Sequence, residues 1–236
     1  MLCIEGLTKT YGTLRAVDDL SLTVAAGDIC GFIGHNGAGK TTTLRAVAGI
    51  LAFDAGRILI NGRSIAEEPV LCKREMAYIP DNPDLYDHLT GIQYLNFVAD
   101  IYGVEGGERR ERIAKYAEAL EMTHRLGDLI GGCSHGMKQK IAIISALLHA
   151  PKLLLLDEPF VGLDPKASHT LKGLMGQMCQ EGAAIFFSTH VLEVAEKLCN
   201  KVAIIKGGRL VAAGEMDAVK GDSSLEELFL ELTDHA

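Results

Sequence analysis

A single short segment limits the possible folds of this chain more than any other. Residues 34–41 read GHNGAGKT and match the pattern G-x-x-x-x-G-K-[ST], which is typical of loops that bind a phosphate chain. The segment follows the apolar run Cys30–Ile33 and precedes a helical pattern. Glycines let backbone N–H groups turn toward an anion, and a helix N-terminus adds positive potential. This context favours a phosphate site over a glycine turn that merely joins strand and helix.

The loop has the chemistry expected of a nucleoside triphosphate site. Lys40 would supply a positive charge to the β- and γ-phosphates, and the Thr41 hydroxyl can ligate Mg²⁺. The predicted nucleotide-binding residues of this segment are Gly34, His35, Asn36, Gly37, Ala38, Gly39, Lys40, Thr41 and Thr42.

A second motif supplies acidic groups. Residues 153–159 read LLLLDEP, in which four apolar residues predict a buried strand that ends in two carboxylates. Asp157 can hold the Mg²⁺ shell, and Glu158 can act as general base on a water that attacks the γ-phosphate. Taken alone, the motif could be an ordinary strand end capped by acids. Together with the phosphate-binding pattern at residues 34–41, it favours a catalytic pair of carboxylates.

Composition excludes several classes of protein. Of the 236 residues, 48% are hydrophobic and 23% are charged, values typical of a globular chain rather than a disordered one. The net charge of −8 argues against a nucleic-acid partner, because neutralising phosphates requires Lys and Arg. Six dispersed cysteines without zinc spacing predict reduced thiols in a cytosolic protein. We expect no signal peptide and no membrane span, since no apolar run approaches about 18 residues.

The negative charge is concentrated at the end of the chain. Residues 215–236 contain seven acids and one base, a net charge of −6, whereas residues 1–214 carry −2. The tail also has the apolar face of an amphipathic helix, formed by Leu225, Leu228, Phe229 and Leu232. We therefore expect an acidic helical tail on a nearly neutral core.

Apolar runs and turn residues predict strands that alternate with helices. The expected strands are Leu2–Leu7, Leu20–Val24, Ile29–Ile33, Gly56–Asn61, Met76–Ile79, Leu153–Leu156, Ala183–Ser188, Lys201–Ile205 and Arg209–Ala212. From about Thr90 to Ala150 the apolar residues recur at spacings of three and four, which predicts a helical subdomain. Further helices are expected at Pro165–Cys179 and Val191–Leu198. This alternation implies an α/β fold with a mostly parallel sheet covered on both faces.

Further motifs occur in an order and spacing that one family uses. Residues 133–140 (CSHGMKQK) are similar to the signature Leu-Ser-Gly-Gly-Gln, residues 161–164 (VGLD) to a loop that faces a partner subunit, and residues 188–190 (STH) to a histidine at a strand end. Tyr11 lies where the family stacks an aromatic ring on adenine. With the two phosphate motifs, nearly the whole chain resembles the ATPase subunit of an ATP-binding-cassette (ABC) transporter.

The resemblance implies ATP and Mg²⁺ as cofactors and a P-loop NTPase fold with an antiparallel β subdomain at the N-terminus and an inserted helical subdomain. A single ABC ATPase domain would span 1–236. Its parts would be a core with the β subdomain at 1–84 and 151–214, a helical subdomain at about 85–150 and an acidic C-terminal tail at 215–236.

The resemblance also implies roles for single residues. His190 would bridge the γ-phosphate, the attacking water and Glu158. Ser134 and Gly136 precede a helix and would receive the γ-phosphate bound to a second subunit. Asp164 would line that facing site, although it could equally be the N-cap of the helix that begins with Pro165. Tyr11 would stack on adenine, with a packed aromatic as the alternative.

Three residues depart from the family pattern. Asp81 stands where many relatives have Gln; it can still approach Mg²⁺ through an oxygen but donates no hydrogen bond. In the signature, His135 replaces a glycine and Met137 replaces a glutamine. We expect lower nucleotide affinity across the dimer rather than loss of function. A protonated His135 could help to bind phosphate, which would raise ATPase activity as the pH falls toward about 6.

The resemblance implies partners as well. One chain carries one signature and one P-loop, so two ATPase subunits are expected, as a homodimer or a heterodimer. They would drive a separate integral-membrane permease from the cytoplasmic face of the membrane. The C-terminal helix and the signature favour an exporter of the drug or antibiotic type. Tyr86 and Tyr94 are candidates for contact with the permease, with core packing as the alternative.

Other functions compete with this interpretation. The main alternative is a soluble ABC-type ATPase of DNA repair or translation, although no second cassette, coiled-coil insertion or basic surface is evident in the sequence. A GTPase would need Asn-Lys-x-Asp, and residues 200–203 (NKVA) lack the Asp. A small-molecule kinase would lack the signature and His190. A module that binds ATP without hydrolysing it remains open because of Asp81 and His135.

Overall fold

The computed structural model describes residues 1–234, so the last two residues of the acidic tail lie outside it. An antiparallel sheet forms at the N-terminal end, with the strand order β2-β1-β4-β5. Its strands are β1 (Leu2–Tyr11), β2 (Leu14–Val24), β4 (Ala55–Ile60) and β5 (Arg63–Ser64). The predicted antiparallel β subdomain is confirmed.

The first two strands are longer than the sequence pattern predicted. Leu7 was expected to end one strand and Leu20 to begin the next, but β1 and β2 continue to a tight connection at Gly12, whose φ is +60°. The added part mixes polar and apolar residues, because most of this end of the hairpin is only partly buried or exposed. A half-exposed antiparallel strand does not need an apolar run, which explains the missed ends.

The second sheet has the order β10-β9-β3-β8-β7-β6 and is parallel except for β10. Its strands are β3 (Ile29–Ile33), β6 (Met76–Ile79), β7 (Leu153–Asp157), β8 (Ala184–Thr189), β9 (Lys201–Lys206) and β10 (Arg209–Glu215). The parallel arrangement brings the carboxyl ends of β3, β7 and β8 to one edge, where residues 34–41, the acids at 157 and 158 and His190 lie.

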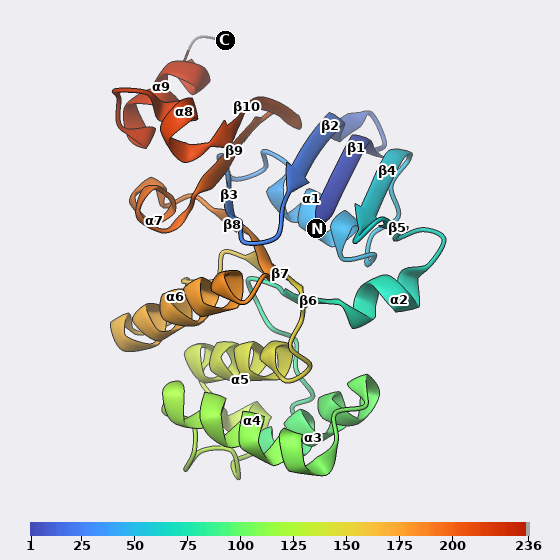
Figure 1. Ribbon diagram of the computed structural model, residues 1–236, viewed down its shortest axis with the longest axis vertical. Coiled ribbons are helices and arrows are strands. Elements are labelled where there is room, and N and C mark those ends of the chain that lie inside the picture. The colour runs from blue at the N-terminus through green and yellow to red at the C-terminus, as the bar shows by residue number, and fades with distance from the viewer. Residues whose placement is uncertain (235–236) are drawn as a thin grey trace.

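Helices cover the sheet and form a separate layer in the middle of the chain (Figure 1). Those beside the sheets are α1 (Lys40–Val47), α2 (Pro69–Arg74), α6 (Pro165–Gln180), α7 (Leu192–Leu198), α8 (Met216–Lys220) and α9 (Leu225–Asp234). The middle layer consists of α3 (Gly91–Tyr102), α4 (Gly106–Ala119), a 3₁₀ turn (Ile130–Gly132) and α5 (His135–Leu147). It lies away from the N-terminal sheet in Figure 1. The predicted α/β fold with an inserted helical region is confirmed.

The apolar run of β7 separates two hydrophobic clusters. Leu153 and Leu155 face the cluster shared with the N-terminal sheet, whereas Leu154 and Leu156 face the cluster shared with α3 to α6. All four side chains are buried to 1% exposure or less. Each contributes on the order of 2 kcal/mol of burial free energy, which fixes the position of the carboxylates that follow. Among residues 1–234, none of the helices is both long and apolar enough to cross a bilayer.

Candidate active site

The segment 34–41, the P-loop, forms the turn from β3 into α1. Its glycines are required by space as well as by conformation. A Cβ on Gly39, whose φ is +111°, would lie 2.4 Å from the backbone oxygen of Ala16, and one on Gly34 would lie 2.6 Å from that of Ile205. Gly39 is also the N-cap of α1 and provides no side-chain cap. The first N–H groups of the helix are therefore available to an anion.

Lys40 is buried at the start of α1. Its ammonium donates hydrogen bonds to the carbonyl oxygens of Gly34 (2.7 Å) and His35 (3.2 Å), so the side chain folds back along the P-loop. Burial lowers the pKa of Lys40, and the nearby carboxylates of Glu158 and Asp157 partly offset that effect. The loop thus presents a positive charge next to backbone N–H groups.

An open cavity of about 340 Å³ lies in front of this loop. It brings together predicted residues from four separate parts of the sequence. Among its lining residues are Tyr11, Asn36, Gly37, Gly39, Lys40, Thr41, Thr42, Asp81, Asp157 and Glu158. The Tyr11 ring is half exposed at 48%, with the ammonium of Lys9 5.4 Å from its centroid. Gly34, His35 and Ala38 belong to the loop but do not line the cavity.

Asp157 has one oxygen that is bonded and one that is not. Its Oδ1 accepts a hydrogen bond of 2.5 Å from the Ser188 hydroxyl. Its Oδ2 is buried and has no hydrogen-bond partner among the described residues. A buried carboxylate oxygen without a donor is costly unless a cation or a water occupies the adjacent space. This orphaned oxygen, in the cavity that Thr41 also lines, fits a hard divalent cation.

Glu158 is held in an unusual backbone conformation beside this carboxylate. Its φ is +47°, a left-handed value that a residue with a Cβ seldom adopts. Its backbone N–H donates to the Ser188 hydroxyl (3.0 Å), which fixes the turn. Its Oε2 lies 3.0 Å from Nδ1 of His190, and its Oε1 lies 3.8 Å from the ammonium of Lys40.

Ser188 was not among the predicted site residues. Its hydroxyl contacts both Asp157 and the Glu158 backbone, so it fixes the relation between the two carboxylates. The sequence held one signal, since Ser188 is the first residue of the segment 188–190, which ends in His190 directly after β8.

Ser134, Gly136 and Asp164 form a second cluster, and none of them lines the P-loop cavity. Ser134 is the N-cap of α5 and accepts from the Met137 N–H (3.3 Å). Asp164 is the N-cap of α6, as one of its two interpretations expected, and accepts from the Ala167 N–H (2.8 Å).

The two helix starts are joined within the chain. A Cβ on Gly136 would lie 2.6 Å from the carbonyl oxygen of Gly162, so the loop before α6 approaches α5 closely. The Lys140 ammonium, on α5, donates to Asp164 (2.7 Å) and lowers the pKa of that carboxyl. Sequence reasoning missed Lys140, because a lysine one turn along a helix gives no sign of its partner.

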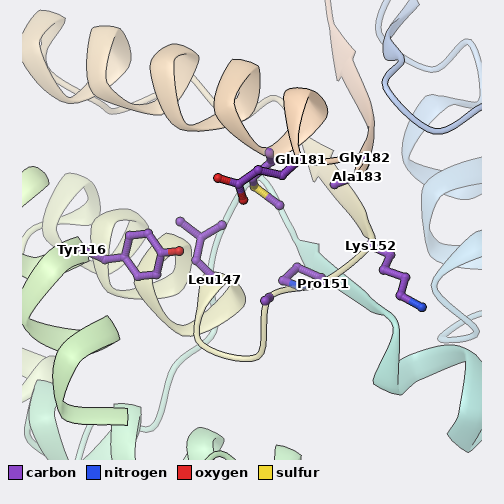
Figure 2. Close-up of a pocket in the computed structure, with 9 residues that line it drawn as sticks. Tyr116, Leu147, Pro151, Lys152, Glu181, Gly182 and Ala183 are labelled. Atoms are coloured by element: carbon purple, nitrogen blue, oxygen red, sulfur yellow. The ribbon is translucent and has the colours of Figure 1, made fainter. Parts of the chain in front are cut away.

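Another cavity, of about 310 Å³, lies where α4 and α5 meet the end of α6 (Figure 2). Figure 2 shows Tyr116 and Glu181 pointing toward the space beside Leu147. None of the predicted site residues lines it. This second cavity therefore lies apart from the predicted site.

Comparison with known proteins agrees with this geometry. Residues 17–161 match a family described as ABC transporter. The ABC-type transporter ATP-binding protein EcsA of Bacillus subtilis is 35% identical to the chain, over 99% of the chain and 96% of that protein. The linearmycin resistance ATP-binding protein LnrL of the same organism is 35% identical, over 91% of the chain and 69% of that protein.

Solved structures give the same result. A structure described as the ATP-binding subunit of an ABC transporter superposes with a TM-score of 0.95 at 36% identity, covering 99% of both chains. A dimeric cassette in a post-hydrolysis state, bound to ADP and Pi, shares the fold with a TM-score of 0.84 at 21% identity, over 92% of this chain and 99% of its own. The chain therefore belongs to the ABC transporter family, as an ATP-binding subunit and an ATPase.

Proposed function

We propose that this chain hydrolyses ATP with Mg²⁺ as half of a two-subunit ATPase. It would drive a separate membrane permease that exports its substrate. The observation that carries the proposal is the pairing at the P-loop cavity. An Asp157 oxygen that is buried and has no partner in the described part of the chain lies next to Glu158, whose carboxylate contacts Lys40 and His190. The proposed parts are the core with its β subdomain at 1–84 and 151–214, the helical part at about 85–150 and the tail from 215.

Binding would use the charge and the N–H groups of the P-loop. The Lys40 ammonium would exchange its two carbonyl partners for the β- and γ-phosphates, and N–H groups from Asn36 to Thr42 would surround the chain of phosphates. Tyr11 stands half exposed at the cavity edge, where its ring is free to stack on adenine.

The residues around Asp157 fit Mg²⁺. Thr41, Asp157 and Asp81 line the same cavity, and oxygen donors of this kind suit a hard cation. Among residues 1–234 no group of three or more His, Cys, Asp or Glu side chains forms a metal site, so phosphate oxygens and water would complete the shell. The ion would neutralise charge that develops on the phosphates.

Glu158 would act as the general base. One carboxylate oxygen would take the proton of the water as the water oxygen bonds to the γ-phosphorus and the bond to the ADP oxygen breaks. His190 would hold the carboxylate through the 3.0 Å contact and orient the γ-phosphate. The left-handed backbone at Glu158 would fix where this carboxylate points.

The second cluster would serve a different subunit. Ser134, Gly136 and Asp164 are outside the P-loop cavity of their own chain, so they are available to the nucleotide of a facing cassette. The dimeric cassette that shares the fold supports such an arrangement. Two subunits, identical or different, would thus form two complete sites.

The permease would dock in a groove between the sheet edge and the helical layer. This groove, of about 360 Å³, is bordered by exposed Tyr86 (49%), Phe97 (42%) and Ile101 (63%), with Tyr94 beside them. Exposed aromatics packed edge to face, such as Tyr86 and Phe97 with ring centroids 5.7 Å apart, are typical of protein contacts. Docking there would place the chain at the cytoplasmic face of the membrane, and LnrL, named for resistance, supports export.

ATP turnover by the purified protein tests the enzymatic part. We expect hydrolysis that requires Mg²⁺ and stops with EDTA, and an Asp157→Asn variant that retains less than 1% of the activity. Activity that is unchanged by EDTA would contradict the proposal.

Co-purification tests the coupling. The chain, expressed from its whole operon, should be retained with an integral-membrane protein encoded there, and a Tyr86→Ser and Phe97→Ser double variant should lose retention. Val70→Ser, at a more exposed apolar residue (65%) on α2, is the control. Retention of the double variant at the control's level would overturn the docking site.

A further inference from the structure

The acidic tail forms a helix that is fixed to the core rather than extended into solvent. In α9, Leu225 and Phe229 are buried, with exposures of 0% and 7%, whereas Glu226 and Glu231 are exposed. The helix start is capped reciprocally, because the Ser224 N–H donates to the Glu227 carboxylate and the Glu227 N–H donates to the Ser224 hydroxyl. The cap at its start and the burial of its apolar face thus hold α9 in one position.

Contacts at both ends hold α9 in that position. Glu196 of α7 accepts from the Lys220 ammonium (2.8 Å) and from the Leu225 N–H (3.4 Å). Lys206, the last residue of β9, donates to the carbonyl oxygen of Leu232 (3.3 Å). Figure 1 shows α8 and α9 together beside β9 and β10.

Phe229 extends this packing to the P-loop. Its ring centroid lies 4.9 Å from that of His35, with the ring planes tilted by 59°. His35 is the second residue of the P-loop, and its carbonyl oxygen accepts one of the two hydrogen bonds of Lys40 (3.2 Å). One residue therefore connects the nucleotide-binding lysine to the tail.

We propose that Phe229 is a positioning residue for nucleotide binding, through which α9 supports the P-loop turn and responds to the bound nucleotide. The proposal rests on the proposed function, since it concerns the same cavity. When a phosphate replaces the carbonyl groups as partner of Lys40, the peptide of His35 loses a donor and the turn adjusts under the Phe229 ring. Linkage requires that α9, if it raises nucleotide affinity, is itself stabilised by nucleotide.

The contact should affect binding rather than chemistry. Phe229 meets the P-loop at His35, whereas the Glu158 carboxylate contacts Lys40 and His190. An aromatic pair has a modest interaction energy, so we expect a several-fold effect on affinity. A P-loop without this support samples more conformations before binding, and the lost preorganisation appears in Kd and KM.

Nucleotide affinity of matched variants provides the test. We expect Phe229→Ala to raise the Kd for ATP and ADP about fivefold and KM by a similar factor, with kcat unchanged. Leu228→Ala, on the same helix and partly buried against the same core, is the control and should leave Kd unchanged. Phe229→Tyr, which keeps the ring, should restore most of the affinity.

A double-mutant cycle with His35→Ala separates a direct contact from a general loss of stability. The Phe229→Ala substitution should have no further effect on Kd once the His35 ring is absent. Independent, additive effects of the two substitutions would overturn the contact.

Hydrogen exchange of the unmodified protein removes any dependence on variants. Amides of residues 225–232 should exchange more slowly when ATP or ADP is bound. Unchanged exchange there, or equal Kd values for Phe229→Ala and the wild type, would overturn the proposal, whereas a wild-type protein that binds no ATP would instead refute the proposed function.

Discussion

The P-loop cavity and the signature cluster differ in how complete they are within one chain. In the cavity, Lys40 and Asp157 are buried, and one Asp157 oxygen has no donor among residues 1–234. In the signature cluster, Ser134 and Asp164 are exposed, yet both accept hydrogen bonds from helix N–H groups. The first region can therefore still bind a cation or a ligand within a single chain. The second is an exposed surface whose polar side chains are held by their helix caps. Substitutions in the first should impair binding by a single chain, and those in the second should impair only the assembled dimer.

The largest effect is expected from the charge of the P-loop. Lys40→Met keeps most of the buried stem but removes the ammonium, so the Kd for ATP should rise at least 100-fold in the isolated subunit. Isothermal titration calorimetry measures this directly. Lys115→Met, exposed on α4, should bind ATP as the wild type does, and equal affinity of both variants would contradict the comparison.

The segment directly after α5 should contribute to stability without affecting nucleotide binding. His149 stacks on Tyr102 at 3.7 Å, and its Nε2 donates to the carbonyl oxygen of Met76. Burial lowers its pKa to about 4. The unfolded chain binds this proton near pH 6.5, so stability is full at neutral pH and declines by about 2 kcal/mol by pH 5.

A His149→Phe variant should therefore show a smaller loss of unfolding free energy between pH 7 and pH 5. Urea denaturation at both pH values measures the difference, with exposed His124→Gln as the control. A variant with the same acid sensitivity as the wild type would show that other groups determine the decline.

The ion pair between the two helix starts should affect the dimer only. Lys140→Met would release Asp164 and lower kcat about tenfold, because the loop before α6 would lose its fixed place against α5. ATP binding to the single subunit should stay unchanged. Lys140→Arg should recover most of the activity, since it can still donate to the carboxylate.

A matched ion pair provides the control for this prediction. Lys138, on the same helix, donates to Asp87 over an equal 2.7 Å and does not involve α6. Lys138→Met should keep nearly full ATPase activity. Equal losses of activity in both variants would mean that a less stable α5, rather than the released Asp164, causes the loss.

The smallest effect is expected at the edge of the cavity. Tyr11→Ala should raise KM for ATP about fivefold, since a half-exposed ring gives only part of a full stacking energy. Tyr11→Phe should behave as the wild type. If both variants leave KM unchanged, Tyr11 packs only against its own sheet.

The comparison also shows what the sequence could predict. The P-loop could be identified from its residues, because only glycine fits at Gly34 and Gly39. At these positions the residue type itself indicates the local backbone geometry. The acids at the end of β7 were likewise visible as a break in an apolar run. Both signals are local, and local physics suffices to interpret them.

What was missed depends on contacts between distant segments. The Ser188 hydroxyl bonds to the Asp157 carboxylate 31 residues away and to the Glu158 backbone N–H 30 residues away, and Lys140 meets Asp164 across 24 residues. The contact of His35 with Phe229 spans nearly the whole chain. No pattern of spacing shows such pairs, because the fold alone decides which side chains meet.

The role of Glu158 as general base is best tested with a Glu158→Gln variant. The amide keeps the shape of the carboxylate but accepts no proton, so hydrolysis should fall at least 100-fold while ATP still binds. We expect this variant to accumulate as a dimer in the presence of ATP, seen as a doubled mass in size-exclusion chromatography with light scattering. If the Glu158→Gln protein hydrolyses ATP at the wild-type rate, Glu158 is not the general base.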